Sequence, residues 1–217
     1  MRFKRKAILL AMLVSVSSVA MSQSTTTKKD LVTTFGVKGG ANLSNLYVKD
    51  VNDENSKLGF QVGLFAKAPI TSAFSIQPEL IYTQKGTELE YNNLFANGKA
   101  SFNLQYVELP IMGVINLTKN FNIQAGVYAS YLAAVKVKNK ATNGSYDFER
   151  EVNKANFQEF DFGLAGGVGF DADKVGLGLR YNYGLREVGK NKQVFGQNYN
   201  FNNGKNSVLQ LYLTLGF

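Results

Sequence analysis

The sequence predicts an all-β protein, an eight-stranded antiparallel up-and-down transmembrane β-barrel. Three observations lead to this prediction. Eight segments alternate between apolar and mixed residues with a period of two, as strands do when one face meets an apolar medium. The connections between them alternate between short and long. No Lys, Arg, Asp or Glu within these segments falls on the apolar face.

The predicted strands cover residues 34–44, 58–68, 73–84, 102–115, 121–135, 160–170, 175–185 and 207–217. The last one shows the pattern most clearly, because its apolar face carries Leu209, Leu211, Leu213, Leu215 and Phe217. Pro78 lies inside the third strand. Because proline lacks the N–H that a central strand needs, a bulge or local irregularity is expected there.

The lengths of the connections predict how the barrel is oriented. Short connections lie at 69–72, 116–120 and 171–174, and long ones at 45–57, 85–101, 138–159 and 186–206. In outer-membrane barrels the short turns and both termini are periplasmic, and the long loops are extracellular. A soluble barrel has the reverse faces, with charges outside and apolar residues inside.

Aromatic residues mark one predicted membrane interface. One aromatic sits on the apolar face at each strand end beside a terminus or a short turn: Phe35, Phe74, Phe121, Phe170 and Phe217. Such belts lie where lipid headgroups meet hydrocarbon. A last strand that contains Tyr212 and ends on Phe217 also resembles the C-terminal signal read by the barrel-assembly machinery, which is therefore an expected partner.

The first residues predict export. Basic residues at 2–6 precede an uncharged run at 7–19 and a small-residue pattern at 20–22, so residues 1–22 are expected to be a cleaved signal peptide. Residues 23–33 form a polar, flexible leader, and residues 34–217 the outer-membrane barrel domain.

Composition excludes several classes of protein. Four of the basic residues behind the net charge of +8 lie in the signal segment, and the remaining +4 is spread too thinly to indicate nucleic-acid binding. The chain has no cysteine, so it has no disulfide framework. After residue 22 no apolar run is long enough for a membrane helix, so any span must consist of strands.

The predicted barrel interior contains charged residues. Lys38, Lys67, Glu79, Glu108 and Arg180 fall on the inward face and are expected to form a charge network. An eight-stranded barrel is just wide enough for side chains to fill it, so a structural plug is the favoured reading. A proton path, a narrow conduit and a small-ligand site are the alternatives.

The sequence does not predict an enzyme. It has neither histidine nor cysteine, which excludes Ser-His and Cys-dependent catalysis. Glu79 and Glu108 resemble a glycosidase pair only in type, since an eight-stranded barrel leaves no room for a sugar. Acidic and amide residues at 50–55 do not have EF-hand spacing, and the glycines at 166–169 lack the Lys of a phosphate loop. No metal or cofactor is expected.

Several stretches resemble a known family. They are 35–44 (FGVKGGANLS), 75–80 (SIQPEL), 82–86 (YTQKG), 106–110 (YVELP) and the glycine-rich 162–170. They are similar to the outer-membrane β-barrel domain common in Bacteroidota, often called PorT-like. This resemblance implies location rather than chemistry, because most members have no assigned role.

The expected function is that of a small non-enzymatic barrel that contacts outer-membrane lipid and has a structural or surface-interaction role. The loops at 86–101 and 186–206, rich in Asn, Gly and aromatic residues, suit an extracellular protein or glycan. The alternatives are a secreted, lipocalin-like barrel that binds a small ligand, and a narrow channel or secretion-complex subunit.

Overall fold

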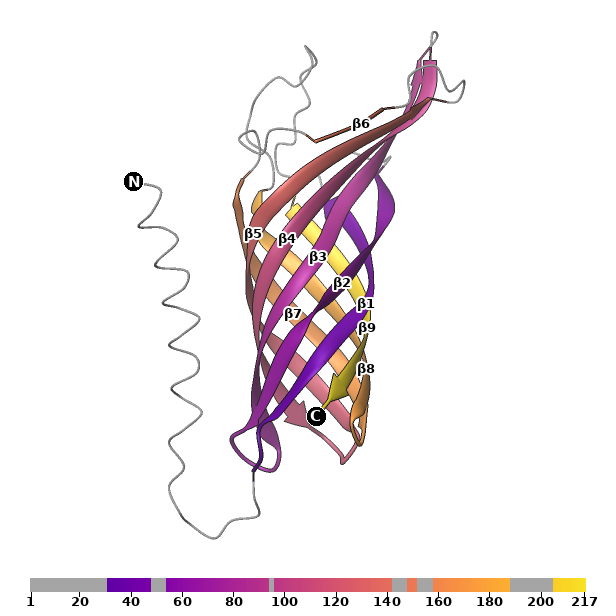
Figure 1. Cartoon of the computed structure of the whole chain (residues 1–217). Helices are drawn as coiled ribbons and strands as arrows, with labels where there is room; N and C mark the ends of the chain where they lie inside the picture. The colour runs from indigo at the N-terminus through magenta and orange to yellow at the C-terminus, as the bar shows by residue number, and fades with distance from the viewer. Residues whose placement is uncertain (1–30, 48–53, 94–95, 142–147, 152–157, 188–204) are drawn as a thin grey trace, which may run out of the picture. The chain divides into compact units, whose positions relative to one another are not determined.

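The computed structural model describes residues 31–47, 54–93, 96–141, 148–151, 158–187 and 205–217. These residues form nine antiparallel strands (Figure 1): β1 (Thr34–Tyr47), β2 (Glu54–Pro69), β3 (Phe74–Asn93), β4 (Ala96–Asn116), β5 (Phe121–Ala141), β6 (Phe148–Glu151), β7 (Phe160–Ala172), β8 (Val175–Glu187) and β9 (Lys205–Gly216). Among the described residues, no helix is long and apolar enough to cross a membrane.

Eight of the strands close into a barrel. Each pairs with its neighbour in the order β1, β2, β3, β4, β5, β7, β8, β9, and β9 pairs with β1. The closing register runs from Gly36 opposite Gly216 to Tyr47 opposite Lys205. The predicted all-β, eight-stranded antiparallel barrel is therefore confirmed. Because the sheet closes, no strand in the barrel wall is left as an unpaired edge.

The two faces of the barrel wall differ in the predicted sense. Outward positions on all eight strands carry large apolar side chains that remain exposed, such as Phe60, Leu109 and Leu211. Inward positions carry buried polar side chains, such as Gln61, Asn122 and Gln210. An apolar girdle of this extent is a membrane-facing surface, because soluble monomers expose only small apolar patches.

The short turns all lie at one end of the barrel, together with the start of β1 and the C-terminus (Figure 1). Two of them use the same local chemistry. Thr71 Oγ1 accepts the N–H of Phe74 at 3.0 Å, and Thr118 Oγ1 accepts the N–H of Phe121 at 2.9 Å. A threonine that bonds its own backbone in this way stabilises a tight turn. In the third turn, Asp173 takes a left-handed φ of 51°, which aspartate tolerates.

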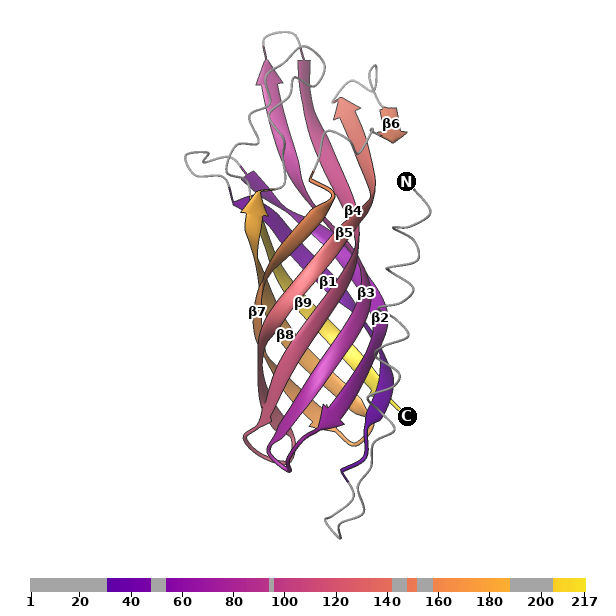
Figure 2. The ribbon, with the colours of Figure 1, turned by 90° about the vertical axis from the view of Figure 1, so that its left-hand side faces the viewer.

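At the long-loop end of the barrel, the strands are longer than the sequence predicts. Residues 85–101 were expected to be a loop, but β3 and β4 continue through most of this range and extend beyond the other strands (Figure 2). β5 extends with them and also pairs with the short β6. Hydrogen-bonded pairing does not require an apolar surrounding, so the strands persist where the lipid-facing pattern has ended.

Pro78 produces no bulge. The pairing of β2 with β3 lapses at Ala66 and Lys67 and resumes in the same register at Ala68. The missing N–H therefore causes only a local interruption. The bulges lie towards the long-loop end instead, for example between Gln105 and Tyr106 in the pairing of β4 with β5.

Candidate functional site

The barrel interior holds the most concentrated chemistry of the described chain. Six charged side chains are buried there, three cationic and three acidic: Lys38, Lys85, Arg180, Glu79, Glu108 and Asp161. Their formal charges cancel. A buried charge is costly unless it is paired and hydrogen-bonded, so the partners of each one decide what the interior can do.

A lower cluster, nearer the short turns, is centred on Glu79 of β3. Arg180 of β8 donates two parallel hydrogen bonds to its carboxylate, both at 2.8 Å, and Lys38 of β1 donates at 3.0 Å. β3 and β8 lie opposite each other in the ring of eight strands. The bidentate pair therefore crosses the lumen and ties the two walls together.

Uncharged residues complete the lower cluster. Gln77 Nε2 donates to Glu79 at 2.7 Å, and Gln124 Oε1 accepts from Arg180 at 2.8 Å and from the Tyr212 hydroxyl at 3.0 Å. The Lys38 ammonium lies 3.7 Å from the centre of the Tyr212 ring, within cation–π range. All of these side chains are buried, and the cluster spans the barrel from wall to wall.

An upper cluster, nearer the long-loop end, is centred on Glu108 of β4. Its carboxylate forms an ion pair with Lys85 and accepts hydrogen bonds from Ser130 at 2.9 Å and Asn182 at 3.1 Å. Asp161 lies higher still and accepts from Asn206 at 2.8 Å. The lower cluster carries two cations and one carboxylate, whereas the upper region carries one cation and two carboxylates. The interior is therefore electrically polarised along the barrel.

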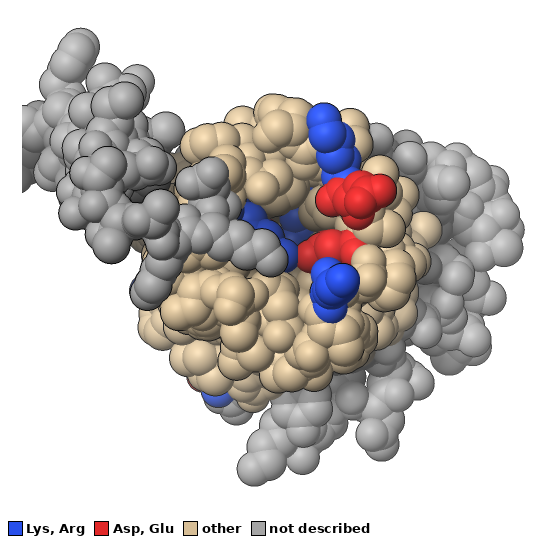
Figure 3. Space-filling model, turned by 90° about the horizontal axis from the view of Figure 1, so that it is seen from below, with Lys and Arg blue, Asp and Glu red and all other residues tan. Residues whose placement is uncertain are grey.

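A third ion pair lies at the mouth of the short-turn end. Lys67 of β2 donates to Asp171 of β7 at 2.8 Å, and Asn122 donates to the same carboxylate oxygen at 3.0 Å. Unlike the two clusters, this pair is partly exposed, at 22% for Lys67 and 39% for Asp171. Figure 3 views this end from below and shows acidic and basic side chains side by side in a hollow.

The structure divides the predicted network among three groups. It brings Lys38, Glu79 and Arg180 together, but it pairs Glu108 with Lys85 and Lys67 with Asp171. Sequence reasoning missed Lys85 and Asp171 as partners. Both lie on the inward alternation of their strands, which continues one step past the predicted ends of those strands.

The predicted aromatic belt and terminal residues have clear positions. Phe35, Phe121, Phe170 and Phe217 are exposed, Phe74 is half-buried, and all five lie at the short-turn end of the wall. Tyr212 points inward, where it joins the lower cluster. The backbone N–H of Phe217 donates to the carbonyl of Phe35 at 2.9 Å, so the last residue is bonded to the first strand.

The interior side chains that the structure describes bond mainly to one another. Within the described ranges, no three acidic, histidine or cysteine side chains come together to hold a metal ion. Each buried carboxylate is engaged by cations, amides or hydroxyls of the interior itself. Bonds that cross the lumen make this region a packed core rather than an open passage.

The closed barrel with an apolar exterior and a polar, filled interior defines the class: an integral outer-membrane β-barrel protein, in contact with lipid. The outer membrane protein beta-barrel domain family matches residues 21–189, and the chain belongs to this family. No curated protein matches the chain.

Solved structures similar to this chain include small outer-membrane proteins. Ail, the attachment invasion locus protein of Yersinia pestis, is 11% identical, with 85% of this chain and 99% of Ail covered and a TM-score of 0.48. Neisserial surface protein A is 18% identical, with 84% and 97% covered and a TM-score of 0.48. The translocator domain of the autotransporter NalP from Neisseria meningitidis is 9% identical, with 99% and 96% covered and a TM-score of 0.37.

Proposed function

We propose that this protein is a non-enzymatic anchor that presents its long-loop end to an extracellular protein or glycan. The observation that supports this role most directly is the packed interior. Glu79 and Arg180 join opposite walls, and Lys38 and Tyr212 pack beside them, so the lumen offers no wide path for solutes. Recognition of an extracellular partner is therefore expected on the surface beyond the membrane at the long-loop end.

The extended hairpin of β3 and β4 is the most prominent part of that surface. Its pairing runs without a break in register from Tyr82 opposite Val107 to Asn93 opposite Ala96. A paired sheet that continues past the apolar girdle gives a binding surface with little conformational entropy to lose. Loops and strand ends on a rigid scaffold are common sites of recognition.

The proposal also includes the orientation of the barrel in the membrane and the processing of the chain. Residues 1–22 are removed as a signal peptide and 23–33 are the leader, although residues 1–30 lie outside the part of the chain that the structure describes. Residues 34–217 insert as the barrel with the short turns and both termini in the periplasm. The rule that long loops are extracellular supports this orientation. Tyr212 and Phe217 act as the signal for the assembly machinery, the five phenylalanines form the periplasmic belt, and the family is the PorT-like group of Bacteroidota.

Shortening the hairpin tests the proposed role. Gly86 and Asn103 are paired across β3 and β4, so residues 87–102 can be replaced by an Asn-Gly turn that leaves the barrel intact. Labelled nanodiscs that carry the mature protein are applied to arrays of glycans and extracellular-matrix proteins. We expect binding above empty nanodiscs, and a loss of at least tenfold for the shortened variant.

The matched control is Lys119→Ala, an exposed substitution in the turn between β4 and β5 at the opposite end. It is expected to bind the arrays like the parent protein. Equal binding by the parent protein and the shortened variant would show that the β3–β4 hairpin is not the binding surface. Signals no higher than those of empty nanodiscs would refute the surface-interaction role.

A further inference from the structure

A cavity of about 360 Å³ opens at the short-turn end of the barrel. We call it the vestibule. Gln77, Gln124 and Tyr212 line its inner part, and these three side chains also belong to the lower cluster. The vestibule is therefore open towards the turns and closed at its inner end by the lower cluster. Its volume lies within the range of small-molecule sites, about 300–1,000 Å³.

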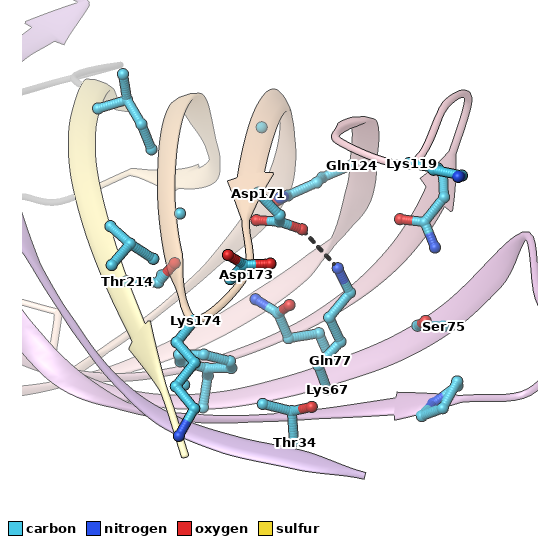
Figure 4. Close-up of a pocket in the computed structure, with 18 of the residues that line it drawn as sticks. Thr34, Lys67, Ser75, Gln77, Lys119, Gln124, Asp171, Asp173, Lys174 and Thr214 are labelled. Carbon is cyan, nitrogen blue, oxygen red and sulfur yellow. Dashed lines mark hydrogen bonds and ion pairs between the residues drawn. The ribbon is translucent and has the colours of Figure 1, made fainter. Parts of the chain in front are cut away.

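Opposite charges face each other across this vestibule. Lys67 belongs to β2 and Asp171 to β7, and these strands lie opposite each other in the ring. Figure 4 shows the Lys67 side chain reaching across to Asp171, with Asp173 beside Asp171. The cation and the carboxylate thus come from opposite walls and meet over a polar hollow.

The Lys67–Asp171 pair is suited to exchange with a ligand. Both side chains are partly exposed, and exposed ion pairs contribute little to stability. A simple anion bound to Lys67, or a simple cation bound to Asp171, would break this ion pair and form one new pair in its place, beside the further charges of Lys119, Asp173 and Lys174 that line the vestibule. A molecule that carries both charges replaces one ion pair with two.

We propose that the vestibule binds a small zwitterion of the amino-acid or short-peptide class. The ligand ammonium takes the place of Lys67 on Asp171, and the ligand carboxylate takes the place of Asp171 on Lys67. Ser75, Gln77 and Thr214 add uncharged polar groups along the walls, which suit a peptide amide. This site is separate from the long-loop surface and does not rest on the function proposed there.

The first test uses the unmodified protein in nanodiscs and three probes. Alanyl-alanine carries both charges, its N-acetyl form lacks the ammonium, and its C-terminal amide lacks the carboxylate. Backbone NMR shifts are followed at Gly169 and Gly176, which line the vestibule, and at Ser130 and Ser207 as distant references. We expect saturable shifts at the two glycines with the zwitterion, and affinity at least tenfold weaker for each capped form.

The second test substitutes the two charged side chains, which lie on opposite walls of the vestibule. Lys67→Gln and Asp171→Asn are each expected to weaken alanyl-alanine binding at least tenfold, whereas the charge-swapped double variant K67D/D171K restores it. Lys205→Gln, at the other end of the barrel, is the control and leaves binding unchanged. Equal affinity for a capped form, shifts centred on Ser130 or Ser207, or full binding by Lys67→Gln would each overturn the proposal.

Discussion

Glu79 is the residue on which the lower cluster depends. Its carboxylate neutralises Arg180 and Lys38 at once and also accepts a hydrogen bond from Gln77. Removing its charge leaves two buried cations with no carboxylate within their cluster. Breaking a buried pair by deleting one partner typically costs about 3–5 kcal/mol.

Glu79→Gln is therefore expected to lower the free energy of unfolding by about 3–5 kcal/mol. The measurement is urea-induced unfolding in detergent, followed by the loss of the folded band in unheated SDS gels and by far-UV circular dichroism, since the chain has no tryptophan.

Lys67→Gln is the matched comparison, because it removes one partner of an ion pair that is partly exposed. Its expected cost is no more than about 1 kcal/mol. Similar costs for the two substitutions would mean that the lower cluster is more hydrated than its burial indicates.

At the scale of the strand, two adjacent glycines of β7 differ in whether a side chain would fit in their place. An ideal Cβ at Gly167 would overlap the carbonyl oxygen of Leu179 and lie 2.9 Å from the Cα of Arg180. A Cβ at Gly166, on the outward face, would meet nothing closer than the carbonyl oxygen of Gln124 at 3.9 Å. Gly167 is thus required by the close approach of β8, whereas Gly166 is not.

Gly167→Val is expected to reduce the yield of folded barrel severalfold, because β7 and β8 cannot keep both their register and the added side chain. Gly166→Val is expected to fold like the parent. Refolding into detergent, scored by the fraction of folded band, compares them directly. Equal yields would show that the β7–β8 wall can move apart at this point.

A change in strand alternation also explains why the sequence does not predict the face on which Val135 lies. Ala133 faces outward, and strict alternation would place Val135 outward too, but the bulge opposite Gln105 and Tyr106 reverses the faces and Val135 is buried. One extra residue flips every later side chain. No turn residue or glycine marks this bulge in the sequence.

At the scale of the whole molecule, the apolar girdle predicts a dependence on membrane depth. Leu179 and Leu185 both face outward on β8, but Leu185 lies near the long-loop end of the strand. An arginine at the bilayer centre costs about 2–4 kcal/mol, and near an interface about 0–1 kcal/mol.

Leu179→Arg is expected to destabilise the barrel in lipid by about 2–4 kcal/mol, and Leu185→Arg by no more than about 1 kcal/mol. Reversible urea unfolding in phospholipid vesicles measures both. The reverse order would place the membrane at a different height on the barrel.

The closed ring also predicts heat-modifiable mobility. Detergent-extracted protein is expected to run as a compact band in unheated SDS and to shift after boiling, because unfolding a closed sheet requires many ladder bonds to break together. The same protein is expected in the membrane fraction. A single mobility together with recovery in the aqueous fraction would contradict a membrane barrel.

The alternation along the chain is enough to predict the barrel, its strand number and the direction in which its faces point, because lipid imposes a period-two pattern on every strand that crosses it. Which interior charges meet depends on how the strands are assembled around the lumen. Glu108 pairs with Lys85 rather than Arg180, and Lys67 reaches Asp171, because strand stagger and curvature set the height of each side chain in the lumen. The length of the β3–β4 hairpin was likewise decided by pairing between strands, which continues where the membrane no longer shapes the sequence.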